Sequence, residues 1–271
     1  GKGRVVHEIL EQIEKDNGQP ALGVMKVNGG ANAGHTAAGL KLNLLPSGVG
    51  NPEVQKLLIG SGVVADPRKF LWEAKPLEKR NLSVFQRLLI DEKTQVSDLT
   101  HRLLDLAWEN YRVKVLGMES RGSTGRGISP AYCDETSQWQ IFYLAFKQDR
   151  KLFSQALKGR VQRAMNTIQH VCKVSPGEWN SFFETLSEAE LRANAEAIKE
   201  GIFQPEEFDF TRFKGKEGFE LEFDLLEEVY WQAGQELAPC IGDVRDILLE
   251  SKKTGAPVVA AFGQAYWLDK R

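Results

Sequence analysis

Apolar residues along this chain recur with two different spacings. In the first 135 residues, short apolar runs of strand length alternate with stretches in which every third or fourth residue is apolar, as in helices. Strands are expected at residues 21–27, 40–45, 54–59 and 85–90, and helices at residues 5–13, 67–75 and 99–108. The second helix should begin at Pro67, because Asp66 is a good capping residue, and should end before Pro76.

After residue 135, long amphipathic charged stretches predominate and indicate helices. The expected helices are residues 140–157, 161–174, 184–200, 219–237 and 243–251. Ser175 should start one helix and Gly201 should end another, whereas residues 204–216 are expected to form a loop or a partner surface. The run APVVAAF, residues 256–262, is continuously apolar, which is typical of a central strand in a parallel sheet.

This order of elements predicts an α/β fold with a mainly parallel central sheet flanked by helices, similar to P-loop NTPases, and a helical subdomain inserted after a second glycine-rich loop. The first part of a nucleotide-binding core is expected at residues 1–135, the helical insertion at residues 136–254 and a return strand of the core at residues 255–271. The chain opens Gly-Lys-Gly-Arg without a methionine and closes soon after an expected strand, so we expect a fragment.

Composition narrows the classes of partner. The 271 residues, 42% hydrophobic and 27% charged, are enough to bury a large core. A formal net charge of −2 provides no broad basic face for a nucleic acid, and no apolar run approaches the roughly 20 residues of a membrane span. We therefore expect a cytoplasmic protein with neither nucleic acid nor membrane as its partner. Three widely spaced cysteines suit neither a disulfide framework nor a zinc site, and are expected to be small buried hydrophobes.

Two glycine-rich loops carry polar groups that indicate chemistry. The first, NGGANAGHT at residues 28–36, follows an expected strand and contains three glycines, two amides, an imidazole and a hydroxyl. Ligands bind at the carboxyl ends of strands in open α/β sheets, so a site is preferred here over a plain turn. The second, GMESRGSTGRGISPAY at residues 117–132, offers hydroxyls and arginines that suit a phosphate monoester, although a flexible solvated loop explains it equally well.

Other features are weaker. Residues 1–4, GKGR, fit the remainder of a phosphate-binding loop at the start of a helix, but taken alone they are better interpreted as a frayed terminus. His101 and His170 lie in helical stretches without a second ligand at suitable spacing, so exposed or core histidines are expected there. The carboxylates of residues 217–228 alternate with apolar residues and are expected on a solvated face.

Taken together and in order, these segments resemble the adenylosuccinate synthetase family. That family has a Gly-Asp-Glu-Gly-Lys-Gly-Lys loop, whose last four positions match residues 1–4, followed by GG-x-NAGHT and LPSG segments. Its later segments read IGNGVV-x-DP, H-x-x-LD and GTTGRGIGPAY, with serine standing in this chain at positions 61, 123 and 129. The matching residues are 29–36, 45–48, 59–67, 101–105 and 122–132. The resemblance spans the whole chain, but residues 139–253 match only in type.

The resemblance implies a GTP-dependent ligase of purine biosynthesis. In that family O6 of IMP is phosphorylated, and the amine of L-aspartate then displaces phosphate to give adenylosuccinate. The expected partners are a purine nucleoside monophosphate, L-aspartate and a nucleoside triphosphate, which is GTP or else ATP or dATP. Mg²⁺ is the expected cofactor, and a homodimer is the expected assembly.

The resemblance also implies roles for individual residues. Lys2 and His35 would be catalytic, acting on the transferred phosphate and on the phosphorylated oxygen, and the backbone of Gly34 would approach Mg²⁺. The residues implied for the triphosphate and metal are Gly1, Lys2, Gly3, Gly34, His35 and Thr36. Those implied for the substrates are Asn32, Ser123, Thr124, Arg126 and Gln264. The catalytic aspartate of the family would precede Gly1 by two residues.

Departures from the family pattern leave the purine open. Gln138 and Trp139 stand where the family has an arginine that crosses a dimer interface, and residues 261–265 keep only Gln264 of its EGAQG motif. Phage-encoded members that convert dGMP to a 2-aminoadenylosuccinate nucleotide, for diaminopurine DNA, commonly carry the GSTG form found at residues 122–125. That activity is one alternative, and an inactive nucleotide-binding or interaction homologue is another. The fragment itself is expected to be inactive.

Overall fold

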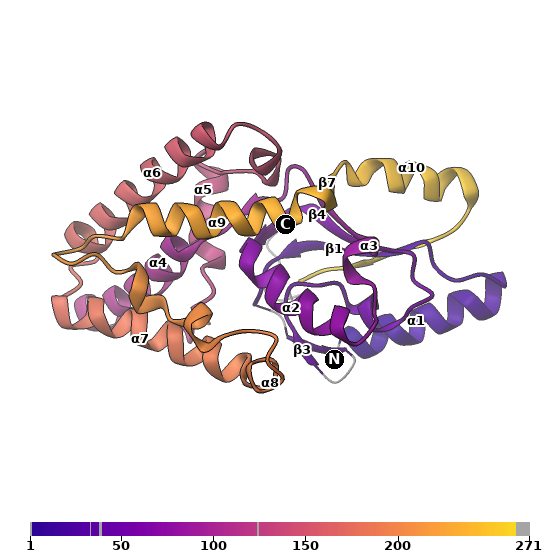
Figure 1. Cartoon of the computed structure of the whole chain (residues 1–271), viewed down its shortest axis with the longest axis horizontal. Helices are drawn as coiled ribbons and strands as arrows, with labels where there is room; N and C mark the ends of the chain where they lie inside the picture. The colour runs from indigo at the N-terminus through magenta and orange to yellow at the C-terminus, as the bar shows by residue number, and fades with distance from the viewer. Residues whose placement is uncertain (1, 33, 38–39, 124, 264–271) are drawn as a thin grey trace. The chain divides into compact units, whose positions relative to one another are not determined.

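The computed structural model describes residues 2–32, 34–37, 40–123 and 125–263, which are divided between two compact units (Figure 1). The first unit comprises Gly1–Val96, Phe142–Gln148 and Gly234–Arg271, and the second comprises Ser97–Ile141 and Asp149–Ala233. The first is α/β and the second is helical. The boundaries between these two units fall at other residues than the domain boundaries expected from the sequence. The expected domain boundaries stay a prediction.

The first unit is built on a parallel sheet with the strand order β7-β5-β4-β1-β8. Its strands are β1 (Gly23–Gly29), β4 (Lys56–Ala65), β5 (Leu88–Asp91), β7 (Ile241–Gly242) and β8 (Val258–Ala261). A further short strand, β6 (Gln95–Val96), pairs in parallel with the end of β4. This sheet confirms the predicted α/β class and the strands expected near residues 21–27 and 54–59.

The strand formed by the apolar run at residues 256–262 differs from expectation in its position. Among the described strands β8 pairs with β1 alone and lies at the end of the order, whereas a central strand was expected. Along this strand Val259 is buried and Ala260 is exposed.

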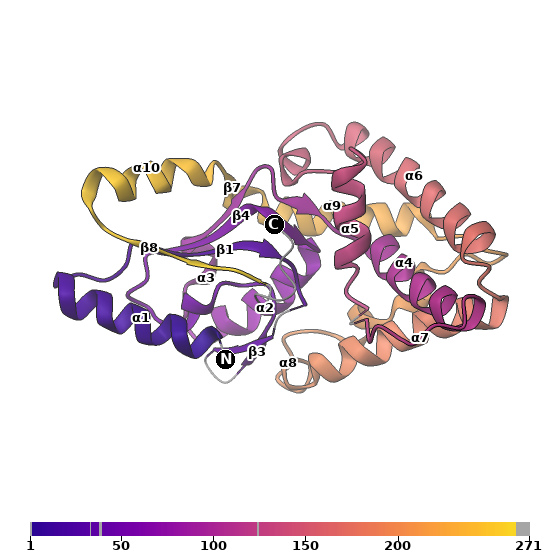
Figure 2. The ribbon, with the colours of Figure 1, turned by 180° about the vertical axis from the view of Figure 1, so that it is seen from behind.

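Helices flank this sheet on both sides. In Figures 1 and 2, α1 (Lys2–Asn17) and α10 (Val244–Thr254) lie on opposite sides of the strands. α2 (Pro67–Lys79) begins where predicted, because the Asp66 carboxylate accepts a hydrogen bond from Arg68 N–H at 2.9 Å. The sequence predicts that this helix ends before Pro76, but α2 continues through Pro76 to Lys79. Pro76 is buried, and packing of this last turn offsets the hydrogen bond that proline cannot donate.

Residues 85–90, expected to be one strand, divide into a helical turn, α3 (Val84–Arg87), and β5. The cause is Arg87, which is buried. Its guanidinium donates to backbone carbonyl oxygens at 2.6–3.0 Å, those of Val49, Asn51, Val54 and Leu82. Because three of these acceptors, those of Val49, Asn51 and Val54, lie far away in the sequence, tertiary hydrogen bonding overrides the strand pattern at this position.

A small antiparallel hairpin follows the first glycine-rich loop. It pairs β2 (His35–Ala37) with β3 (Leu40–Leu42), with His35 opposite Leu42. The strand expected at residues 40–45 therefore forms only as far as Leu42, and a 3₁₀ turn, η1 (Ser47–Gly50), comes soon after.

The second unit is helical, as predicted for this part of the chain. Its α-helices are α4 (Leu99–Asn110), α5 (Ile128–Thr136), α6 (Arg150–Asn166), α7 (Pro176–Ala193), α8 (Ala195–Lys199) and the first residues of α9 (Phe223–Leu237). Shorter turns are η2 (Tyr111–Val115), η4 (Thr167–Val171), η5 (Pro205–Phe208) and η6 (Phe210–Phe213), while η3 (Tyr143–Lys147) and η7 (Ala238–Cys240) belong to the first unit. Among the described residues, no helix has both the length and the apolar character needed to cross a bilayer.

Three expectations for the helical region are wrong. Residues 140–157 do not form one helix, because Tyr143 and Phe146 are buried in the first unit and α6 begins only where Asp149 caps Lys151 N–H. α6 then continues to Asn166 without the break expected near residue 160. Residues 204–216 are not simply a loop or partner surface, since the phenylalanines of η5 and η6 are fully buried.

Local signals succeed better at the other helix ends. Ser175 begins α7 through a capping box with Glu178, as its sequence predicts.

The three cysteines are free thiols, and Cys172 and Cys240 are buried as expected. Cys133 is exposed, contrary to expectation, because it lies on the outward face of α5, next to the buried Asp134.

Candidate functional site

The first glycine-rich loop follows β1, at the carboxyl end where the sequence places a site. β1 is irregular just before the loop, since its register on β4 shifts between Lys26 and Asn28. A Cβ at Gly62 of β4 would lie 2.8 Å from the Val27 carbonyl oxygen, so the irregular strand requires glycine opposite it. β1 ends at Gly29, whose φ of 78° favours glycine.

The loop is closed by polar contacts of its asparagines. Asn32 Oδ1 accepts a hydrogen bond from Gly30 N–H at 3.2 Å, which holds the turn. Asn28 Oδ1 accepts another from Gly263 N–H at 2.8 Å, so the loop touches the segment after β8. Asn32 and the residue before Gln264 therefore lie at the same edge of the sheet; Gln264 itself is outside the described residues.

The structure describes other predicted residues of this unit only in part. Lys2 and Gly3 lie in the first turn of α1, and Gly34, which is exposed, precedes β2, to which His35 and Thr36 belong. Among the predicted site residues, Gly1, Thr124 and Gln264 lie outside the described residues. Of Lys2, His35 and Thr36 only the backbone is described. Their roles stay predictions.

The second glycine-rich loop belongs to the second unit and is tied to α4. Arg102 Nε donates to the Gly125 carbonyl oxygen at 3.0 Å, and Asp105 Oδ2 accepts from Gly127 N–H at 3.0 Å. Ser123 Oγ accepts from Gly125 N–H at 3.2 Å, so this hydroxyl lies within the loop's own turn. Both residues that fix the loop belong to the H-x-x-LD segment, residues 101–105, and sequence reasoning missed this role.

Arg126, predicted to contact the substrates, has an acidic partner in its own unit. Its guanidinium forms an ion pair with Glu190 of α7, whose side chain is fully buried. Glu190 also lies 3.0 Å from Arg102 Nη1. One buried carboxylate thus offsets two guanidinium groups, one of which comes from the loop and the other from the helix that holds it.

His101 is a core residue, one of the two possibilities expected from the sequence. Its Nδ1 accepts from Asp98 N–H at 3.1 Å, so the proton lies on Nε2, which is 3.2 Å from Asp134 Oδ2. Burial raises the pKa of Asp134, but hydrogen bonds from His101 and Arg163 outweigh it and lower the pKa to about 2. The His101 backbone supports the loop, since a Cβ at Gly127 would lie 2.7 Å from the His101 carbonyl carbon.

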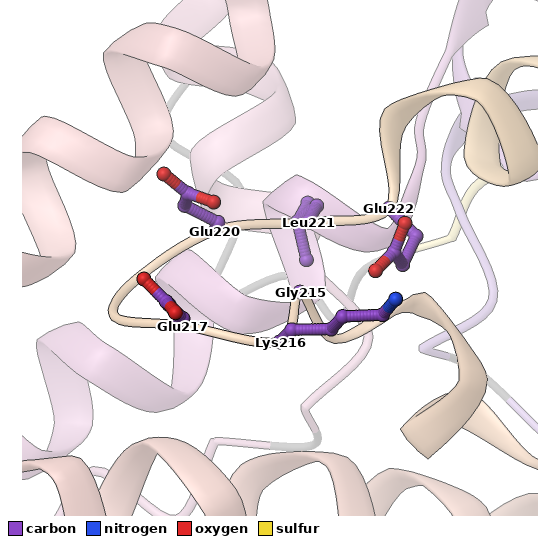
Figure 3. A pocket seen from close by; sticks show the side chains of 6 residues that line it. All are labelled: Gly215, Lys216, Glu217, Glu220, Leu221 and Glu222. Atoms are coloured by element: carbon purple, nitrogen blue, oxygen red, sulfur yellow. The ribbon is translucent and has the colours of Figure 1, made fainter.

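Within the described parts of the chain, no three His, Cys, Asp or Glu side chains gather closely enough to hold a metal ion. A surface pocket of about 380 Å³ opens elsewhere in the second unit, and Figure 3 shows its lining. Glu217 and Glu220 lie on one side, and the Lys216 ammonium approaches Glu222 on the other. None of its residues belongs to either glycine-rich loop. Glu217, Glu220, Glu222 and Asp224 are exposed, as expected of a solvated acidic face, but Glu227 is buried and pairs with Arg150, so the expectation fails at that residue.

Comparison with known proteins finds one family throughout. The family model for adenylosuccinate synthetase matches residues 1–208. Curated proteins named adenylosuccinate synthetase are similar to this chain. That of Hahella chejuensis is 35% identical over 195 residues, or 70% of this chain and 42% of that protein, and that of Thermosynechococcus vestitus is 32% identical over 251 residues, or 89% and 53%. The chain therefore spans about half the length of the curated relatives it matches.

A solved structure agrees on the fold. The fully ligated adenylosuccinate synthetase from Plasmodium falciparum superposes with a TM-score of 0.62 over 96% of this chain and 47% of that chain, at 18% sequence identity. That likeness extends over both units, including the helical region where the sequence motifs are weak. The resemblance drawn from the six motifs is confirmed, and so is the mainly parallel α/β fold.

Proposed function

Because the chain belongs to the adenylosuccinate synthetase family, we propose that it is part of a ligase that joins L-aspartate to C6 of a 6-oxopurine nucleoside monophosphate. The single observation that carries this proposal is the NGGANAGHT loop at the carboxyl end of β1, which is held against the segment after β8 by Asn28 and Gly263. Ligands of open α/β sheets bind at that edge. The substrates proposed are IMP, L-aspartate and GTP.

The reaction proceeds in two steps. First, N1 of the purine gives its proton to a base, which in the family is the aspartate that would precede Gly1 by two residues. O6 attacks the γ-phosphorus of GTP and forms an O6–P bond, while the bond to the β,γ-bridging oxygen breaks and GDP leaves. Second, the aspartate amine attacks C6, the C6–O6 bond breaks, phosphate departs with O6, and the amine loses a proton. An oxo group is a poor leaving group, and phosphorylation makes it a good one.

The residues of the first unit suit the charge that develops in these steps. Lys2 lies in the first turn of α1, where the helix N-terminus and the ammonium together attract a phosphoryl group. His35 is assigned the donation of a hydrogen bond to O6 as negative charge grows there. The Gly34 backbone is exposed and offers an oxygen ligand of the kind Mg²⁺ prefers, and Mg²⁺ when bound offsets the charge of the phosphates. Gly3, Thr36 and the residue Gly1 complete the assigned triphosphate site.

The second unit is assigned the nucleotide monophosphate. Ser123 and Thr124 are assigned hydrogen bonds from their hydroxyls, and Arg126 is assigned an attraction to the phosphate charge. Family likeness also assigns Asn32 and Gln264 to the nucleotide. Arg126 keeps its ion pair with Glu190 while one face of its guanidinium serves the substrate, since its side chain is 18% exposed. We extend the proposal to a cytoplasmic homodimer, on family likeness.

An isotope experiment on the full-length protein tests the reaction. With IMP labelled with ¹⁸O at position 6, GTP, Mg²⁺ and L-aspartate, the expected products are adenylosuccinate and phosphate that carries the label. Unlabelled phosphate would contradict the 6-phosphoryl intermediate. Product from dGMP and none from IMP would instead support the 2-aminoadenylosuccinate alternative, suggested by the GSTG sequence at residues 122–125. Nucleotide binding without product from either purine would support the inactive homologue.

A further inference from the structure

We propose that Asn43 is a positioning residue for the Gly34–His35 end of the first loop, and that buried Lys26 and Glu73 hold Asn43 in place. The inference rests on the proposed function for its effect on catalysis. Its structural basis is a cluster of opposite charges around one backbone position, directly after the β2–β3 hairpin.

Glu73 supplies the negative half of this cluster. It lies in α2, only 4% exposed, and its carboxylate accepts hydrogen bonds from three successive backbone N–H groups. Oε1 lies 2.9 Å from Asn43 N, and Oε2 lies 2.9 Å from Leu44 N and 3.0 Å from Leu45 N. A buried carboxylate is costly unless such donors surround it, so these contacts fix the segment firmly to the helix.

Lys26 supplies the positive half. It lies in β1, is 6% exposed, and its Nζ donates to the Asn43 carbonyl oxygen at 2.8 Å. The N–H and the C=O of one residue are therefore held by a buried carboxylate and a buried ammonium from two different elements. Lys69, also buried, places its Nζ 3.7 Å from Glu73 Oε1 and further offsets the charge.

The side chain of Asn43 transmits this anchoring to the loop. Since His35 pairs with Leu42 in the hairpin, Asn43 stands opposite Gly34 one step further along. A Cβ at Gly34 would lie 3.4 Å from Asn43 Nδ2, so the carboxamide abuts this glycine without overlapping it. Asn43 thus fixes the position of the Gly34 backbone, which is assigned to Mg²⁺, and of the adjoining His35, which is assigned to O6.

A positioning role differs from a merely structural one in what Asn43→Ala changes. The substitution removes the carboxamide but keeps both backbone hydrogen bonds, so the fold is retained. Hydrogen exchange of the full-length protein without substrates should show faster exchange of the amides of residues 34–37, by about tenfold. The value of kcat should fall about tenfold with KM for aspartate little changed, because small displacements of reacting groups slow chemistry more than binding. The melting temperature should stay close to that of the wild-type protein.

Asn51→Ala is the matched control, because Asn51 lies in the same unit and its side chain makes a similar local contact, accepting from Glu53 N–H at 2.9 Å. It should leave both exchange at residues 34–37 and kcat unchanged. Wild-type exchange and wild-type kcat in Asn43→Ala would overturn the inference, and so would a uniform rise in exchange across the first unit. If the wild-type protein shows no ligase activity but exchange responds as expected, the proposed function fails while Asn43 still positions the loop.

Discussion

Replacing Glu190 by glutamine tests whether one buried carboxylate organises the second loop. The substitution keeps the shape of the side chain and removes its charge. Arg102 and Arg126, whose side chains are 7% and 18% exposed, then lose the carboxylate that both of them contact. Breaking a buried ion pair by removing one partner costs about 3–5 kcal/mol. The glutamine oxygen still accepts from one guanidinium, which recovers about 1 kcal/mol. The expected loss of unfolding free energy is therefore about 2–4 kcal/mol.

Urea unfolding followed by the far-ultraviolet helix signal measures this loss, with Glu184→Gln as the control. Glu184 lies on the same helix but is exposed, so its substitution should change the unfolding free energy by less than about 0.5 kcal/mol. Hydrogen exchange should also accelerate at the amides of Gly125 and Gly127, because the loop loses one of its anchors. If Glu190→Gln is no less stable than the control, the carboxylate does not offset the two arginines and the reasoning is refuted.

Three further predictions follow from single contacts. Gly127→Ala should destabilise the second unit by about 2 kcal/mol or more, because the new Cβ would clash with the His101 backbone at a residue whose φ is 73°. Gly117→Ala is the control, since Gly117 also has a positive φ but has open space around it. Equal losses of stability in thermal unfolding of the two variants would contradict the steric cause. Asp134 has a folded-state pKa of about 2, below its unfolded value, so its stabilisation is present above about pH 4 and lost as pH falls towards 2. Asp134→Asn should flatten that part of the curve of unfolding free energy against pH, and an unchanged slope would count against it. Glu73→Gln should lower the unfolding free energy by about 2–3 kcal/mol, because the new side-chain NH₂ group would face a backbone N–H. If calorimetry shows no loss of stability, Glu73 does not anchor the segment after the hairpin.

The sequence predicts the elements whose ends are set locally. Asp66 and Ser175 mark helix starts because a side chain within three residues satisfies the first free N–H groups, and such signals need no tertiary context. It fails where distant groups decide. Arg87 converts part of an expected strand into a helical turn, and residues 142–148 leave the expected helix because Tyr143 and Phe146 are buried in the first unit.

The same division holds for the candidate site. Both glycine-rich loops are visible in the sequence, because glycines, amides and hydroxyls cluster within a few residues. Their supports are not, because Glu73 and Glu190 occur in amphipathic helices where a carboxylate is usually exposed. The one available signal is position: each is buried on a helix face that its neighbours mark as apolar. Arg126 shows the limit most clearly, since its motif suggests a ligand contact and the fold gives it a buried acidic partner.

The pairing of β1 with β8 has a consequence for synthesis of the chain. Gly23 and Val258 are neighbours in the sheet, but the whole second unit is translated between them. At about 5–20 residues per second, β8 leaves the ribosome on the order of ten to fifty seconds after β1. The residues of the helical unit, Ser97–Ile141 and Asp149–Ala233, are all translated within that interval. Throughout it, the edge of β1 that β8 will cover exposes unpaired backbone groups, which favours pairing with another strand.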